Sequence, residues 1–412
     1  MARWARVAPA QPRARPPVQP TDHSEPPIRQ LYMLMIGLFI SYFGIAMSLS
    51  AVPIYVVDSM HLSNAHGGLA VGIAFLSTIL TRGYAGQRAD RLGGKVCMQR
   101  GLKLYIAAGF VCLIAGLPQW PVPVAYTILI AGRLLLGLGE SLAIVGTLGW
   151  AMSLMGPARS GKVMALSGIA MYGAYAAGGP LGLVALNRLG FMGLMGVCIA
   201  LPVIGLIAIR PLAPTTPHSG HRQSFWQVIG LIWKPGAAVG LQGIGFAALG
   251  AFFSLYFLSR GWPHAGLGLT CFGAGFVLVR VLCGHLPDRI GGRPVAVVSL
   301  AVEACGQYLL WLAPTPGVAL AGAFMTGLGC SMVFPSMGLE AVKLVPPQLR
   351  ATAIGGFAAF QDLAYGATGP VLGLLADHAG YSPVFLLGGL AATVGILMAI
   401  QTKRPASPPV QA

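Results

Sequence analysis

The chain has 412 residues, of which 56% are hydrophobic and only 9% are charged, and its formal net charge is +16. A water-facing surface cannot be covered by this small number of charged residues. The composition therefore excludes a soluble protein and indicates a membrane protein. The positive charge does not indicate nucleic-acid binding, because the lysines and arginines are spread over many loops. The seven cysteines show no CxxC spacing and predict neither disulfides nor a metal site.

Residues 1–30 are rich in arginine and proline and are predicted to be a disordered cytosolic tail. The uncharged run that begins at Leu31 is too long for a cleaved signal peptide and predicts a first membrane span. A spanning helix needs about 20 mostly apolar residues. Twelve such segments follow one another, near 31–57, 66–85, 99–117, 123–153, 163–187, 191–209, 236–258, 264–285, 295–313, 317–343, 351–376 and 383–401.

A polar stretch separates the sixth span from the seventh and predicts a chain of two halves, 31–209 and 235–401. The linker, 210–234, is expected in the cytosol, as is the short tail 402–412. Within the linker, Ser224–Lys234 carries a tryptophan near each end, which predicts a short helix lying in the membrane interface.

The basic residues indicate the orientation in the membrane. The loops assigned to the cytoplasm contain Arg88, Arg91, Lys95, Arg100, Arg159, Lys162, Arg210, Arg222, Lys234, Arg289, Arg293, Lys343, Arg350, Lys403 and Arg404. The opposite loops contain only Arg188 and Arg260. Because cytoplasmic loops carry the excess of lysine and arginine, both termini are predicted to be cytoplasmic in a bacterial inner membrane.

The two halves repeat each other in sequence. A shift of 198 residues superposes 86–95 (GQRADRLGGK) on 284–293 (GHLPDRIGGR) and matches Arg82 to Arg280. A shift of 190 residues superposes two later segments, around 137–141 and 174–180, on their counterparts in the second half. Tandem copies of one six-span unit are the usual construction of secondary transporters.

Twelve spans, the tandem repeat and the G-x-x-x-D-R-x-G segment after spans two and eight resemble the major facilitator superfamily. The resemblance implies an all-α membrane fold of two six-helix, pseudo-symmetric bundles. It also implies that the two charged segments are gating loops, with a latch near the start of span eleven and its mirror near span five. The residues concerned are Gly86, Asp90, Arg91 and Gly93 in the first copy and Gly284, Asp288, Arg289 and Gly291 in the second. The alternative is a tight turn that only fixes the topology.

Span four contains two charged residues, Arg133 and Glu140. They lie seven residues apart, on one face of the helix but about 10 Å apart along it, too far for direct contact. A charge at this depth is unfavourable unless it is paired or faces water. The second half has Ala323 and Cys330 at these positions, so the repeat itself does not require the charges. This favours substrate binding or proton coupling, although a structural arginine bonded to nearby carbonyls remains the alternative.

Span eleven contains Gln361 and Asp362, and span nine contains Glu303. In the family that this chain resembles, spans four and eleven lie at or beside the central cavity and span nine is peripheral. Asp362 is therefore the first candidate for a proton-coupling carboxyl group and Glu140 the second, with Gln361 beside them. The sequence assigns Glu303 no role beyond a hydrogen bond to a neighbouring span.

Glycine and proline occur together in spans five and eleven, as Gly179-Pro180 and Gly369-Pro370. They predict a bend and close helix packing. The first pair resembles the antiporter motif of the family but has one residue too few before the next glycine. It favours export over import.

The sequence therefore predicts a transporter, not an enzyme, that exports a small polar or amphiphilic solute in exchange for protons, acting as a monomer without a cofactor. Import or facilitated passage of a sugar or organic acid is the alternative. A membrane enzyme is disfavoured because no catalytic motif is found. A non-transporting receptor built on the same fold would also show the repeat, but such a receptor is expected to carry an additional soluble signalling domain. Ser41-Tyr42 and residues 341–346 also resemble a bacterial branch labelled arabinose-like sugar efflux.

Overall fold

The computed structural model describes residues 28–156, 159–215, 225–346 and 350–402, and the statements below refer to these residues. The N-terminal tail, which the sequence predicts to be disordered, and the predicted cytosolic tail 402–412 lie almost wholly outside them. The first half contains α1 (Ile28–Ile54), the π-helical turn η1 (Tyr55–Ser59), α2 (Asn64–Leu92), α3 (Gly94–Ala115), α4 (Val122–Met155) and α5 (Ser160–Ile209). The second half contains α6 (Phe225–Ser259), α7 (Leu267–Cys283), α8 (Leu286–Ile290), α9 (Gly292–Trp311), α10 (Pro316–Lys343), α11 (Arg350–Ala379) and α12 (Ser382–Ile400).

Nine of the described helices are long and apolar enough to cross a membrane. One of these, α5, has 50 residues and is broken at Gly190, where φ is 67° and ψ is −178°. Because glycine adopts a positive φ without strain, α5 forms two consecutive spans joined at this residue. With α7 and α11, the described residues contain twelve membrane-length segments, and the predicted fold class is confirmed.

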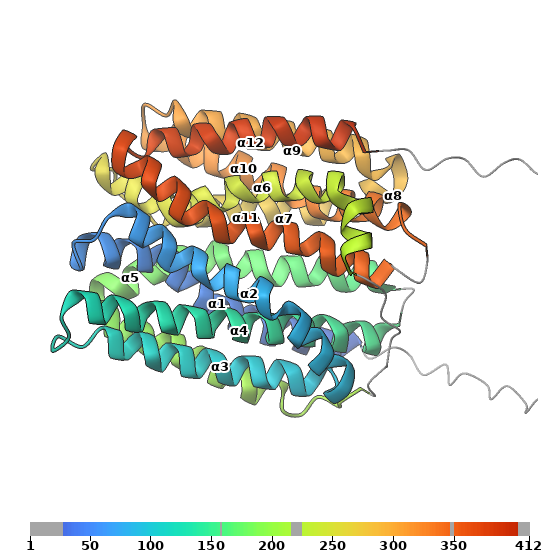
Figure 1. Ribbon diagram of the computed structural model, residues 1–412, viewed down its shortest axis with the longest axis horizontal. Helices are drawn as coiled ribbons and strands as arrows, with labels where there is room; N and C mark the ends of the chain where they lie inside the picture. Colours follow the sequence, from blue (N-terminus) through green and yellow to red (C-terminus); the bar gives the residue numbers. More distant parts are fainter. Residues whose placement is uncertain (1–27, 157–158, 216–224, 347–349, 403–412) are drawn as a thin grey trace, which may run out of the picture.

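The helices form two layers that follow the order of the chain (Figure 1). Helices α1–α5 pack mainly against one another, and α6–α12 do the same. The main contacts between the layers are made by two helix pairs, α2 with α11 and α5 with α7. These pairs are spans two and eleven and spans five and eight, so the contacts follow the pseudo-symmetry of the repeat.

We call the end of the bundle at which α1 begins and α12 ends the terminal end, and the opposite end the far end. In Figure 1 the terminal end is on the right. Helix α2 starts at the far end with Asn64, and α11 finishes there with Ala379. The two helices of this pair therefore run in opposite directions.

Glycines allow the crossing helices to come close at the far end. A Cβ atom on Gly68 of α2 would collide with the backbone of Gly369 of α11, and one on Gly72 would collide with the carbonyl oxygen of Gly366. Toward the terminal end of α2, a Cβ on Gly83 or Gly86 would meet nothing within 4 Å. The α2 and α11 backbones thus touch near the far end and not at Gly86.

The prediction of a loop at 86–95 is wrong in its detail. Helix α2 continues to Leu92, so Gly86, Asp90 and Arg91 lie on its last turns. The turn itself consists of Gly93, whose φ is 84°, and its counterpart in the second half is Gly291, whose φ is 92°. Positive φ is unfavourable for residues with a Cβ, which explains why glycine occupies both positions.

The helix predicted over Ser224–Lys234 is present from Phe225 onward, but it is not a separate element. Helix α6 begins at Phe225 and continues through Pro235 to Ser259. Its position in the membrane interface stays a prediction. A proline within a helix removes one backbone hydrogen bond without necessarily ending the helix.

Candidate functional site

The first element of the site is an ion pair between the two halves. Arg82 of α2 binds the carboxylate of Asp362 of α11 through Nη2, and the two side chains are 24% and 12% exposed. A charge within a membrane span requires a partner or contact with water, and here each residue provides the partner of the other. The sequence analysis identified Asp362 but missed Arg82. The signal was present, because Arg82 interrupts an apolar span and repeats as Arg280.

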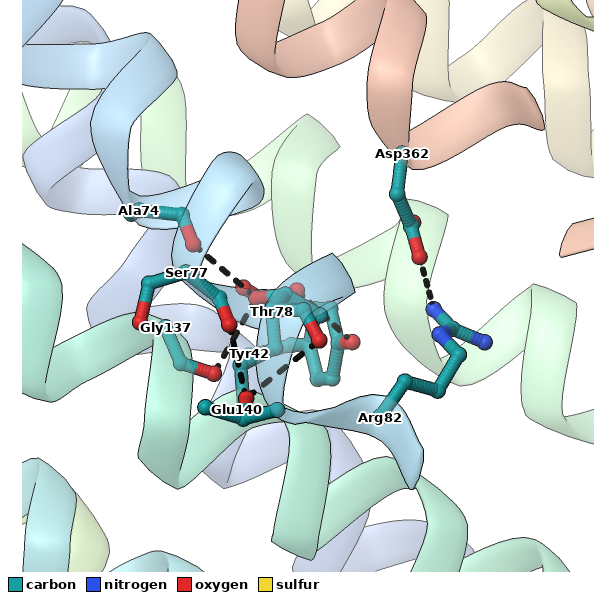
Figure 2. Close-up of polar contacts among 9 residues, drawn as sticks. Tyr42, Ala74, Ser77, Thr78, Arg82, Gly137, Glu140 and Asp362 are labelled. Atoms are coloured by element: carbon teal, nitrogen blue, oxygen red, sulfur yellow. Dashed lines mark hydrogen bonds and ion pairs between the residues drawn. The ribbon is translucent and has the colours of Figure 1, made fainter. Parts of the chain in front are cut away.

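Helix α4 holds the α2 side of this ion pair in place. Thr78, one turn before Arg82, donates through Oγ1 to the carbonyl oxygen of Gly137 at 3.1 Å and to that of Ala74 at 3.0 Å. Ser77 donates to the carbonyl oxygen of Leu134 at 2.7 Å. Small hydroxyl residues thus let α2 and α4 lie close together beside the ion pair (Figure 2).

Glu140 of α4 lies in the same region. It is 6% exposed, and its Oε1 accepts a hydrogen bond of 3.1 Å from the hydroxyl of Tyr42 on α1. Figure 2 shows this bond beside the Arg82–Asp362 ion pair. The structure therefore brings together the two carboxyl groups that the sequence singled out.

Arg133 has different partners. Its Nε donates to the carbonyl oxygen of Ala70 at 2.8 Å, and its Nη1 donates to Ser48 Oγ at 3.0 Å. The guanidinium also lines a cavity of about 30 Å³ within the first half, beside Ser41 and Cys112. That volume holds about two water molecules. These contacts agree with the structural alternative, an arginine bonded to its own half, better than with a substrate-binding cation.

Gln361 points away from the ion pair of its neighbour. Its amide donates to Oε1 of Gln242 on α6 at 3.0 Å, and Gln242 is 1% exposed. Gln361 therefore joins α11 to α6 within the second half and not to the first half.

An aromatic cluster occupies the contact between the halves, and the sequence analysis did not predict it. We define the central aromatic cluster as Tyr172, Tyr175, Phe246, Phe272, Phe276 and Tyr365. Tyr172 of α5 stacks on Phe276 of α7 with ring centroids 3.5 Å apart, and its hydroxyl lies 3.4 Å from that of Tyr365 on α11. The members come from four spans distant in the sequence, so no local pattern identifies them.

The predicted bend residues lie where the halves cross. A Cβ on Gly179 of α5 would come within 2.7 Å of Leu269 on α7. Pro180 lies against Gly266, and Gly369 lies against Gly68. Pro370, which follows Gly369 in α11, lies close to Gly72 of α2. These motifs therefore lie at helix crossings, as the prediction of close packing requires.

The charged segments at the terminal end form no ion pair between the halves among the described residues. Asp90 and Asp288 belong to neither of the two ion pairs found there. Residues 347–349, which precede α11, lie outside the described part of the chain. The latch thus stays a prediction.

Glu303 of α9 is fully buried, and neither carboxyl oxygen has a hydrogen-bond partner among the described residues. Its Oε1 lies against Gly245 of α6, since a Cβ there would be only 2.6 Å away. The thiol of Cys330 on α10 lies beside this carboxyl group, and the hydrogen bond to a neighbouring span stays a prediction. In the described residues no cluster of three histidine, cysteine or acidic side chains could hold a metal ion.

Comparison with known proteins adds a family and a fold. The model of the Major Facilitator Superfamily matches residues 34–267 and 237–412. An uncharacterized MFS-type transporter of Salmonella typhimurium is 44% identical over 366 residues, covering 89% of this chain and 94% of the relative. One from Burkholderia pseudomallei is 37% identical over 370 residues, covering 90% and 91%.

Solved structures show the same arrangement of helices. The crystal structure of the nucleoside transporter NupG has a TM-score of 0.74 at 14% identity, covering 91% of this chain and 100% of that one. The crystal structure of a D-xylose–proton symporter has a TM-score of 0.74 at 16% identity, covering 92% and 98%. At these identities the likeness concerns the fold alone.

Proposed function

Since the chain belongs to the major facilitator superfamily and is a membrane transporter, not an enzyme, we propose that it exports a small polar or amphiphilic solute in exchange for protons. The observation that carries this proposal is the Arg82–Asp362 ion pair, which joins one helix of each half. An acid in this place can link its own protonation to the separation of the halves.

The proposed orientation places the terminal end in the cytoplasm of a bacterial inner membrane. It rests on the distribution of lysine and arginine, which leaves only Arg188 and Arg260 for the far end. The close glycine contacts between α2 and α11 then lie on the outer side. We therefore assign this conformation to the state that is closed to the outside.

Proton exchange would operate through the ion pair. When Asp362 is ionised, Arg82 holds α11 against α2. When a proton binds the carboxylate, the charge attraction is lost and the two halves are free to separate. Because the pair is formed in the conformation closed to the outside, Asp362 has released its proton toward the cytoplasm. One inward proton per cycle would then drive the solute outward.

Glu140 is the second proposed acid. Its bond from Tyr42 links α4 to α1 within the first half, so its protonation would not directly release the contact between halves.

Import of a sugar or organic acid is the second candidate. The fold neighbours include a nucleoside transporter and a D-xylose–proton symporter, and the central aromatic cluster offers ring faces on which a flat or sugar-like solute can stack. Proton coupling through Asp362 would serve symport equally well, with the solute moving in the direction of the proton.

The test is proton movement in inside-out membrane vesicles that contain the protein. A pH-sensitive dye is followed while sugars, organic acids, amino acids and cationic drugs are added one at a time. Exchange predicts that a substrate on the cytoplasmic face releases protons from the acidified vesicle interior. Symport predicts proton movement in the same direction as the solute. Solute flux without any proton movement would contradict both versions.

A further inference from the structure

Arg280 of α7 is a second arginine at the contact between the halves, and within the described ranges its charge has no acidic partner. Its Nη2 donates to the backbone carbonyl of Ser331 on α10. Its Nε is buried and has no hydrogen-bond partner among the described residues. The guanidinium carbon lies 5.0 Å from the ring centroid of Phe276. A guanidinium has five N–H donors. The carbonyl of Ser331 accepts one of them, so most of the donors of Arg280 have no acceptor among the described residues.

The internal repeat shows what is missing. A shift of 198 residues matches Arg280 to Arg82, and a shift of 190 residues matches Tyr172 to Asp362. In the first arrangement α2 provides the arginine and α11 the carboxylate that neutralises it. In the second, α7 provides the arginine, but α5 provides the neutral phenol of Tyr172, which stacks on Phe276 beside Arg280. One of two symmetry-related arginines thus lacks its counter-charge.

None of the acids in the part of the chain that the structure describes replaces this counter-charge. The chain has ten aspartates and glutamates, of which Asp22 and Glu25 lie outside the described residues in the N-terminal tail. The two ion pairs formed by the described residues are Arg82 with Asp362 and Lys343 with Glu340. A poorly solvated cation without an anion is unfavourable within a membrane protein, so such residues commonly mark a binding site.

On the side that faces the first half, Arg280 lies against a glycine and not against a larger side chain. The residue opposite is Gly168 of α5, and a Cβ there would be 3.7 Å from the guanidinium carbon. No side chain of Gly168 covers this face of the arginine. The central aromatic cluster begins beside it, because Phe276, on which Arg280 lies, stacks with Tyr172.

We propose that Arg280 binds the anionic group of the transported solute, a carboxylate or a phosphate, while the central aromatic cluster packs against its organic part. The proposal rests on the proposed transport function and narrows its substrate class to organic anions. The anion would complete, between α5 and α7, the ion pair that Asp362 completes between α2 and α11. A forked guanidinium suits both carboxylates and phosphates, since it can bind two oxygens at once.

Binding can be tested without transport, on the purified protein in detergent. Its thermal stability is measured with benzoate, phenyl phosphate, benzyl alcohol or benzylamine at equal ionic strength, and with chloride or inorganic phosphate alone. The expected result is a rise in Tm with benzoate or phenyl phosphate and none with the neutral and cationic compounds. Comparison of these two anions distinguishes a carboxylate site from a phosphate site.

Substitutions test whether the anion binds at Arg280. Arg280→Gln is expected to weaken anion binding roughly tenfold or more, because it removes the charge of a partly buried pair. Arg188→Gln, which changes an exposed arginine, is expected to bind as the wild type does. Tyr172→Asp should abolish anion binding, because the new carboxylate takes the place of the ligand, and it should do so more completely than Tyr172→Asn, which removes the same ring without adding a charge.

Equal stabilisation by benzyl alcohol, or unchanged anion binding in Arg280→Gln and Tyr172→Asp, would overturn the proposal. So would the absence of any anion effect on the wild type. None of these outcomes depends on proton coupling. A failed proton-exchange measurement with intact anion binding would instead refute the transport mechanism and leave the site standing.

Discussion

Asp377, in the last turn of α11, binds Asn64, the first residue of α2. Its Oδ1 accepts a hydrogen bond of 2.8 Å from the backbone amide of Asn64 and one of 2.9 Å from the side-chain amide. Its Oδ2 accepts a third bond, of 3.1 Å, from the amide of Ala65. The first amides of a helix lack partners within the helix and favour an anion. A residue of the second half thus caps a helix of the first half and holds the far end closed.

We predict that Asp377→Asn opens the far end. The substitution keeps one acceptor oxygen but removes the negative charge and the second acceptor at the start of α2, a loss worth about 1 kcal/mol, which shifts the balance between open and closed forms roughly fivefold. The measurement is the distance between spin labels at Gln119→Cys and Pro314→Cys, two exposed positions of the far end in different halves. Asp58→Asn is the matched control, an exposed acid of the same end, and should leave the distance distribution unchanged. An unchanged distribution in Asp377→Asn would refute the cap.

The same contact predicts a pH dependence. Burial raises the pKa of Asp377, but the hydrogen bonds from Asn64 and Ala65 lower it by more than burial raises it. The pKa of Asp377 therefore lies below the ordinary value of 3.8. A lowered pKa means that the cap is fully formed above 3.8 and is lost as the pH falls through the lowered value. The spin-label distances should therefore stay constant from neutral pH down to about pH 4. If lowering the pH from 7 to about 4 opened the far end of the wild-type protein but not that of Asp377→Asn, the assignment would be contradicted.

The Arg82–Asp362 pair predicts strong coupling in a double-mutant cycle. Arg82→Gln or Asp362→Asn alone leaves a poorly solvated charge unpaired, and each should lower the stability by about 3 kcal/mol. The double variant removes both charges and should lose less than the sum. Chemical denaturation in detergent measures these differences. Lys343→Gln, in the more exposed pair with Glu340, is the control and should change stability by about 0.5 kcal/mol or less. Additive losses would exclude a functional ion pair.

Gly68 and Gly83 of α2 should respond oppositely to alanine. At Gly68 a Cβ would collide with Gly369, so Gly68→Ala should push α11 away at the far end and impair transport. At Gly83 nothing lies within 4 Å, so Gly83→Ala should keep transport and stabilise the helix by roughly 0.5–1 kcal/mol. Transport rates and Tm of the two variants provide the comparison. Normal transport in Gly68→Ala would show that the close crossing is not required.

Much of the fold was predictable from the sequence, because long apolar segments and the distribution of basic residues depend on local composition. The ends of the spans agree with the structure to within a few residues at most positions, as for 317–343 against Pro316–Lys343. The break at Gly190 was also anticipated as the boundary between spans five and six. The exceptions were 86–92, where helix α2 continued through a charged stretch, and 225–234, which is continuous with span seven.

The site was less predictable, because it depends on which spans meet. A charged residue in an apolar run is visible in a sequence, and so Asp362 and Glu140 were found. The partner of such a residue is not visible in the sequence. Asp362 pairs with Arg82, which belongs to the other half. Arg133, the arginine that the sequence singled out, binds Ala70 and Ser48. The cap by Asp377 was missed for the same reason, since it joins residues 313 positions apart.

The claim most in need of a direct measurement is that Asp362 carries the exchanged proton. Asp362→Asn resembles a permanently protonated carboxyl group, so it should still exchange labelled for unlabelled substrate across the vesicle membrane. It should not drive the substrate uphill, because that requires the proton to bind and leave. The account predicts exchange near the wild-type rate together with the loss of proton-driven accumulation. Proton-driven accumulation retained in Asp362→Asn would contradict it.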